Sequence, residues 1–507
     1  MFESRRRHQI FCIMSGHGTS NNSPRGTPER DGRTASERYL ARLSDHSFLN
    51  LWSYPNIYID KKQNGRGAGR ELCDLLVVCG AHVLIFSDKH IDWPETGDLN
   101  VAWCRWFRRA VRESVKQVRG AERWIAQFPQ RLFIDKGCTA PLPVTFPSPE
   151  HRKVHCIVIA NGATKACRDF FKGGTGTFLI RPELRDSDHE NSTSPNYLPF
   201  AIGDVDTKQT FVHVFNEVSF EIAMKELDTI ADFTGYLDKK FRFIRSGHLL
   251  SAEGEEDLLA YYMTHMSGTE EHDFTSPDNQ PWRDGEAITI AGAFMNLQAN
   301  PRYIAKKAAD KISYAWDELI NVFTRPMMDG TVVVPDGHQF TLESHEEAVR
   351  FMALQGRFKR RILAKGVLDA LEHGANNPRF SRIFVSPATS PDRHTAFFVM
   401  TLTCLPELRF SVSPSEYEGR YRVVRRHMLE AYGYSYLKKY PYLERVIGIG
   451  TEPKNAHGGS QDLILFEQPN WTPEIERQLV ECCEHYDILQ RPMRETVPTE
   501  SEWPVPE

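Results

Sequence analysis

The 507-residue chain has little of several features that mark membrane-spanning, secreted and zinc-ribbon proteins. It has no apolar run of about 18 residues, so no segment predicts a transmembrane helix. The apolar stretch that follows Arg5–Arg7 is too short for the hydrophobic region of a signal peptide. Ten cysteines are few for this length, and none forms a CxxC pair, which excludes a disulfide framework and a zinc ribbon. We therefore expect a soluble, cytoplasmic protein that has no membrane partner.

Positive charge is not in excess either. The 62 basic and 67 acidic residues give a net charge of −5, so a surface that attracts nucleic acid must be local. A hydrophobic content of 40% and a charged content of 25% are typical of globular proteins. At about 150 residues per domain, the length indicates three domains or fewer.

Composition and periodicity divide the chain into three parts. Residues 1–35 are rich in Ser, Gly, Asn, Thr and Arg, and are expected to form a disordered tail. Residues 36–250 alternate strand and helix patterns, including a helix over about Leu99–Gln127 with Asp98 as its N-cap. Residues 251–507 mix strand-like runs with a helix predicted from a Ser344/Glu347 capping box to near Gly374. This last part predicts an α+β domain of unknown role.

Two apolar runs on either side of Gly80-Ala81 predict a β-hairpin. With a two-residue turn, Asp74 lies opposite Ser87 and Leu72 lies opposite Lys89. Because side chains alternate along a strand, Asp74, Ser87 and Lys89 should share one face, far from the turn. Both faces of the hairpin are otherwise apolar, so burying Asp74 and Lys89 there costs free energy unless the two charges are compensated. Two interpretations of Asp74 and Lys89 are open: they belong to a functional site, or they form a salt bridge at the end of the strands.

The segment ELCDLLVVCGAHVLIFSDK, between a strand and a long helix, resembles the PD-(D/E)xK, or restriction-endonuclease-like, nuclease superfamily, and within it the type IV restriction and NERD-like branches. The resemblance covers about residues 36–180. It implies a mixed sheet flanked by helices, an α/β fold. It also implies a catalytic centre that uses Mg²⁺ or Mn²⁺, with Asp74 as the first acid, Ser87 at the position of the second acid and Lys89 as the lysine. Gln117 matches a glutamine that some branches place near the site.

One position departs from the family pattern, because residue 87 is Ser where an acidic residue is usual. Losing a carboxylate weakens the binding of a divalent cation. The metal ligands expected from the resemblance are therefore Asp74 together with Glu37, which matches an acidic position on the first helix, and Glu71.

The helix over Leu99–Gln127 has a basic stripe. At 100° per residue, one face carries seven cations, and an apolar face lies opposite. Such a stripe suits a phosphate backbone, although a solvated face packed against acidic neighbours would have the same pattern. The nucleic-acid-binding residues that this stripe predicts are Arg105, Arg108, Arg109, Arg112, Lys116, Arg119 and Arg123.

The sequence thus predicts a metal-dependent nuclease that hydrolyses phosphodiester bonds. The resemblance favours DNA over RNA and implies a role in bacterial defence against foreign DNA. One alternative is a degenerate nuclease fold that binds nucleic acid without cutting it. Another is a sensor or interaction protein whose C-terminal half controls the front half. Self-association into a homo-oligomer is left open.

Overall fold

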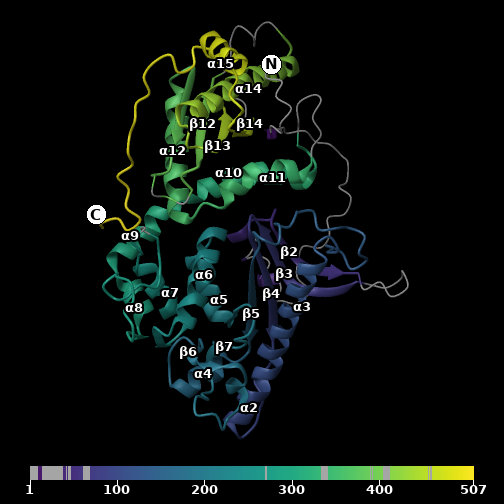
Figure 1. Cartoon of the computed structure of the whole chain (residues 1–507), viewed down its shortest axis with the longest axis vertical. Helices are drawn as coiled ribbons and strands as arrows, with labels where there is room; N and C mark the ends of the chain where they lie inside the picture. The colour runs from purple at the N-terminus through teal and green to yellow at the C-terminus, as the bar shows by residue number, and fades with distance from the viewer. Residues whose placement is uncertain are drawn as a thin grey trace. The chain divides into compact units, whose positions relative to one another are not determined.

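The computed structural model describes residues 9–13, 38–40, 43, 47–60, 69–268, 271–332, 341–388, 390, 392–403, 412–454, 456 and 460–506 (Figure 1). These residues form two compact units. The hairpin unit comprises the described residues of Arg25–Ala305 and the short segment Ala353–Arg357. The C-terminal unit comprises strand β1 (Gln9–Ile13) and the described residues of Lys306–Met352 and Phe358–Pro504. No helix in these ranges is long and apolar enough to cross a membrane.

The hairpin unit is built on a five-stranded mixed sheet in the order β2-β3-β4-β5-β8. The strands β2, β3 and β4 are antiparallel neighbours, whereas β4, β5 and β8 run parallel. A smaller mixed sheet has the order β10-β9-β6-β7. The first-sheet strands are β2 (Ser53–Ile59), β3 (Arg70–Cys79), β4 (His82–His90), β5 (Lys153–Asn161) and β8 (Val212–Phe215); those of the second are β6 (Leu179–Arg185), β7 (Ala201–Asp204), β9 (Leu249–Ala252) and β10 (Ile288–Ile290).

Helices cover both faces of the five-stranded sheet. On one face, α3 packs against β3, β4 and β5 (Figure 1). On the other face, α5 packs against β5 and β8, and the rings of Phe86 and Phe220 are 6.0 Å apart. The helices of this unit are α2 (Leu99–Phe107), the π-helical turn η1 (Arg108–Arg112), α3 (Glu113–Gln127), α4 (Thr164–Phe171), the 3₁₀ turn η2 (Asp186–Glu190), α5 (Glu217–Glu226), α6 (Ile230–Ser246), α7 (Glu255–Thr264) and α8 (Ala293–Ala299).

The predicted hairpin is confirmed, and so is its register. Leu75 pairs with Phe86 and Cys79 pairs with His82, as a two-residue turn requires. Gly80 has a φ of 58°, a conformation that suits glycine in such a turn. Leu75, Leu76, Val77 and Val78 are all buried, so both faces of the hairpin are covered. This sandwiched sheet agrees with the expected α/β class with flanking helices.

The C-terminal unit is a five-stranded mixed sheet in the order β1-β14-β13-β12-β11. Helix α14 packs on one face through Tyr432 and Tyr436, which contact Phe398 of β12. Trp316 of α10 meets Phe397 on the opposite face. The elements are α10 (Tyr314–Asp329), α11 (Leu342–Ala353), α12 (Arg357–Ala375), β11 (Arg379–Phe384), β12 (Thr395–Leu402), α14 (Pro414–Lys439), β13 (Arg445–Thr451), β14 (Gln461–Glu467) and α15 (Pro473–His485), with α9 (Pro301–Asp310) and the 3₁₀ turn η3 (Lys311–Ser313) preceding them.

Three boundaries differ from those expected. The expected division after residue 250 falls inside β9, which pairs with β6 and β10, so the unit continues to Ala305. Residues 9–13, within the segment expected as a disordered tail, form β1 and pair antiparallel with β14. The helix expected from Ser344 to Gly374 is two helices, because α11 starts at Leu342 and ends at Ala353, and three residues separate it from α12. Ser344 therefore lies within α11.

Candidate functional site

Asp74 lies one residue beyond the last pair of the hairpin ladder, which ends at Leu75–Phe86. At this point its carboxylate connects the two strands. Oδ2 of Asp74 accepts a hydrogen bond from the backbone N–H of Asp88 at 2.6 Å. The half-buried carboxylate is therefore held by the backbone of the neighbouring strand, and its position does not depend on a flexible partner.

Gln117 of α3 joins Asp74 to Ser87. Its Nε2 donates to Asp74 Oδ1 at 3.4 Å, and its Oε1 accepts a hydrogen bond from the Ser87 hydroxyl at 2.9 Å. Ser87 is completely buried. Its hydroxyl thus fixes which way the Gln117 amide faces, with the N–H₂ group turned towards the acid. Three of the four expected catalytic residues are brought together by this chain of hydrogen bonds.

Lys89 follows Ser87 by two residues along β4, so the two side chains point to the same face of the sheet. It pairs with Ala160 of the parallel strand β5. Within the described part of the chain, its ammonium group makes no hydrogen bond and no ion pair. Its charge nevertheless reaches α3: the pKa of Glu113 is lowered, mainly by the hydrogen bond and charge of Lys116 and in addition by the charge of Lys89.

Glu113 is a carboxylate that the sequence reasoning did not include, and it lies near Lys89, since the charge of Lys89 helps to lower its pKa. It begins α3 and lies one turn before Gln117, so the two side chains project from the same side of the helix. The spacing of four residues from Gln117 was the signal available in the sequence. Glu113 is exposed, and it offers a second acidic group on the face where residue 87 has none.

The other two expected metal ligands are Glu37 and Glu71. Glu37 lies outside the described residues. Glu71 is placed three residues before Asp74 on β3 and pairs with Tyr58 of β2. Burial, Asp74 and Glu71 together raise the pKa of the Cys73 thiol well above its usual value.

The donor atoms on this face suit a hard divalent cation. Asp74 supplies carboxylate oxygens that are already oriented, and Glu113 supplies another carboxylate. Mg²⁺ and Mn²⁺ are bound by one or two carboxylates and several water molecules, which matches this small acidic set. Asp74 therefore offers an oriented carboxylate of the kind that the expected ion binds.

The long helix after the hairpin forms as predicted, with the Asp98 carboxylate capping it by accepting from the N–H groups of Asn100 and Val101. The residues expected to pack inward are all buried: Trp103, Phe107, Ala110, Ser114, Val118, Ala121 and Ile125. The basic stripe, however, is not continuous. Arg105, Arg108, Arg109, Lys116 and Arg123 are exposed, whereas Arg112 and Arg119 are not.

Arg112 and Arg119 differ from the other cations of the stripe, because their guanidinium groups are engaged within the protein. Arg112 donates to Glu190 at 2.6 Å and to the Val205 carbonyl at 2.7 Å. Arg119, 3% exposed, donates to Glu122 at 3.0 Å and to Asp206 at 3.3 Å. The physical reason is that acidic side chains and carbonyl groups of the segment around Glu190 and Val205–Asp206 lie against this side of the helix and take up both guanidinium groups.

The remaining cations of the stripe fall into two groups. Arg108 forms an ion pair with Glu190, and Lys116 with Glu113. Within the described residues, Arg105, Arg109 and Arg123 form no ion pair. These three are exposed, which leaves them able to meet an anionic partner.

Comparisons of the chain with family models, with curated proteins and with solved structures found no match.

Proposed function

We propose that the hairpin unit is a metal-dependent nuclease that hydrolyses phosphodiester bonds, with DNA as its substrate. The observation that carries the proposal is the chain from Ser87 through Gln117 to Asp74, on the face of β4 that also carries Lys89. This group lies towards the carboxyl ends of the parallel strands β4 and β5, the edge at which open α/β sheets bind ligands. The proposal explains why polar and charged groups gather on an otherwise apolar face.

Each residue has a definite task in this proposal. A bound divalent cation supplies a Lewis acid for the phosphate and lowers the pKa of an attacking water. Asp74 binds the cation, with Gln117 and the Asp88 backbone holding its carboxylate in place. Glu113 replaces the acid missing at position 87. Lys89, which has no competing partner in the described residues, stabilises the charge that develops on the phosphate.

A degenerate nuclease fold that binds nucleic acid without cutting it is the second candidate. The observation that favours it is the complete burial of Ser87, whose hydroxyl is committed to Gln117. A hydroxyl used in this way cannot replace a carboxylate ligand. The two candidates differ in one property: only the first requires cleavage that depends on Mg²⁺ or Mn²⁺.

Cleavage of plasmid and single-stranded DNA in Mg²⁺ or Mn²⁺ separates them. We expect wild-type protein to nick DNA, and Lys89→Ala to lower the rate about 100-fold, as when a group that stabilises developing charge is removed. Lys165→Ala is the matched control, because Lys165 is an exposed cation on α4 that pairs with Asp169. Binding of DNA by a wild-type protein that never cuts it would favour the degenerate fold.

Binding can be tested separately through the three exposed arginines that form no ion pair. Reversing Arg105, Arg109 and Arg123 to Glu should weaken affinity for DNA of any sequence. The logarithm of the DNA-binding constant should also fall less steeply with the logarithm of the salt concentration. The slope should shrink by about 2.7, because each of the three lost phosphate contacts contributes about 0.9. Reversal of Arg302, Lys307 and Lys311, which are also exposed, gives the same change in net charge as a control. Equal affinity in the folded variant would remove this helix from the proposal.

A further inference from the structure

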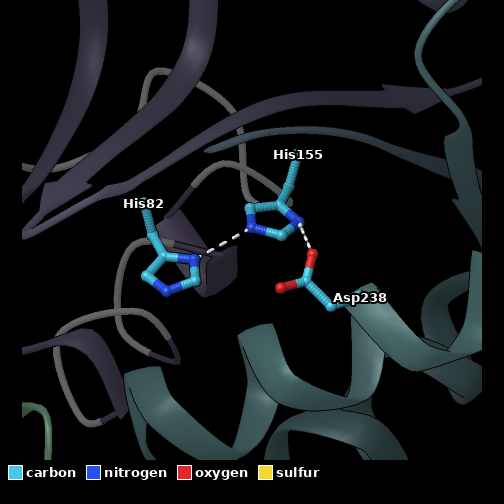
Figure 2. Close-up of side chains that lie close together, drawn as sticks. All are labelled: His82, His155 and Asp238. Atoms are coloured by element: carbon cyan, nitrogen blue, oxygen red, sulfur yellow. Dashed lines mark hydrogen bonds and ion pairs between the residues drawn. The ribbon is translucent and has the colours of Figure 1, made fainter. Parts of the chain in front are cut away.

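Three side chains of types that can bind a metal ion lie together on the other face of the same sheet. His82 is the first residue of β4, His155 belongs to β5, and Asp238 belongs to α6. Figure 2 shows the three side chains converging, with His155 between the other two. One ligand atom from each residue lies within 4.8 Å of the others. The fold thus brings together three residues that are far apart in the sequence: 73 positions separate His82 from His155, and 83 separate His155 from Asp238.

The distances within this group are close to those of a metal site. His82 Nδ1 lies 3.1 Å from His155 Nε2, and His155 Nδ1 lies 4.0 Å from Asp238 Oδ1. Ligand bonds of about 2.0–2.1 Å in a tetrahedron separate neighbouring ligand atoms by about 3.4 Å. The 3.1 Å contact is a hydrogen bond between the two rings, and an ion would replace it. Asp238 faces the other nitrogen of His155, so its side chain has to move towards His82 Nδ1 and His155 Nε2 to join them on one ion.

Burial prepares the two imidazoles for a cation. His155 is 4% exposed and His82 is partly buried. Burial is the main reason that the pKa of His82 falls to about 4 and that of His155 to about 3.

Asp238 keeps one oxygen for the cation. Its Oδ2 faces the ammonium group of Lys153 at 3.8 Å, whereas its Oδ1 faces His155. The Lys153 side chain is 57% exposed, so it can turn into solvent without leaving a buried charge behind. A cation at this point would replace Lys153 as the partner of the carboxylate.

We propose that His82, His155 and Asp238 form a site for a transition-metal ion, Zn²⁺ in the first instance, which fastens α6 to the hairpin. Two imidazole nitrogens and one carboxylate oxygen favour Zn²⁺ and similar ions over Mg²⁺, which prefers oxygen ligands alone. Three protein ligands leave the fourth position to water. The partial exposure of His82 and Asp238 gives water and the ion a path to the site.

This site is separate from the proposed nuclease centre. His82 begins β4 beside the turn, whereas Ser87 and Lys89 lie five and seven residues further along, on the opposite face. At 3.3 Å per residue, His82 and Ser87 are about 16 Å apart along the strand. Loss of zinc and loss of nuclease activity can therefore be measured independently.

Titration of chelator-treated, untagged, full-length protein with Zn²⁺ tests the proposal. We expect one equivalent to bind by calorimetry and to raise the melting temperature, because an ion that binds only the folded state stabilises it by mass action. Co²⁺ should bind in its place and give the visible absorption of a tetrahedral ion. Mg²⁺ should produce neither effect.

Variants locate the site. His82→Gln should abolish stoichiometric Zn²⁺ binding, and Asp238→Asn should weaken it at least tenfold. His151→Gln is the matched control, because His151 is an exposed histidine just before β5. Asp74→Asn should bind Zn²⁺ as wild type does.

His82 lies at the partly exposed start of a strand, so its variant should fold even if substitution of His155 does not. Absence of Zn²⁺ binding at micromolar concentrations, or undiminished binding by the His82 and Asp238 variants, would overturn the proposal.

Discussion

Replacing Asp74 with Asn should abolish metal-dependent cleavage of DNA and the binding of Mg²⁺ at the proposed nuclease centre. Asn is nearly isosteric, so its carbonyl oxygen can still accept the hydrogen bond from the Asp88 backbone. What is lost is the negative charge, and an amide is a poor substitute for a carboxylate as the main ligand of a hard cation. Cleavage rates and Mg²⁺ titration calorimetry of the folded variant measure the two effects. Affinity for DNA should remain, because the phosphate contacts proposed for Arg105, Arg109 and Arg123 do not need the ion.

Substitutions of Gln117 and Ser87 distinguish the effect of the Asp74 charge from the effect of the hydrogen bonds that hold its carboxylate in place. Gln117→Ala removes the amide that holds Asp74 Oδ1, and Ser87→Ala removes the hydroxyl that orients the amide. Loss of such supporting contacts costs about 10–100-fold in activity or metal affinity, so both variants should keep measurable cleavage. Asp92→Asn is the matched control, because the Asp92 side chain is fully exposed after the end of β4.

The same experiment tests the role of Glu113. If it replaces the acid missing at position 87, Glu113→Gln should reduce cleavage and raise the Mg²⁺ concentration that cleavage needs. An Asp74→Asn variant that keeps cleavage within tenfold of wild type would show that the reaction takes place elsewhere. In that case Lys89 and Gln117 would have only a structural role.

The hairpin and its polar end could be predicted because both follow from local rules. A two-residue turn sets the register, and alternation then assigns Asp74, Ser87 and Lys89 to one face. The helix that follows begins at a clear N-cap and has an apolar face, so its packing on the sheet was also predictable. The contact of Gln117 with Ser87 and Asp74 results from that packing.

Features that depend on distant parts of the chain could not be predicted. The partners of Arg112 and Arg119 include Glu190, Asp206 and carbonyl groups of the following loops, and no local pattern indicates them. The π-helical turn has no signature that a uniform helical wheel can include. Likewise, His82, His155 and Asp238 come from three separate elements, and none is part of a short ligand-spacing motif.

The largest effect on stability should come from Arg425 in the C-terminal unit. Arg425 of α14 and Asp462 of β14 are both completely buried, with Arg425 Nε donating to Asp462 Oδ2 at 2.5 Å. The guanidinium also donates to the backbone and hydroxyl oxygens of Ser460, and it lies over the Tyr421 ring. Burial disfavours the cation, but the charge and hydrogen bond of Asp462 together with Tyr421 outweigh it and raise the pKa of Arg425.

Arg425→Met should lower the free energy of unfolding by about 3–5 kcal/mol, because it leaves the Asp462 carboxylate buried without its cation. Urea denaturation of the full chain, followed by circular dichroism, measures the loss. Arg426→Ala is the matched control: Arg426 is the next residue on α14 and pairs with Glu430, but both side chains are partly exposed. A pair of that kind contributes less than about 1 kcal/mol.

The double variant Arg425→Met/Asp462→Leu tests the cause of that loss. If the uncompensated carboxylate is what destabilises Arg425→Met, removing it should recover most of the lost stability, since buried ion pairs are often replaceable by apolar residues of similar size. If the double variant is as unstable as the single one, the cost arises from lost packing around Tyr421 and the hydrogen bonds to Ser460. A loss in Arg425→Met no larger than that in Arg426→Ala would contradict the burial of this pair between α14 and the sheet.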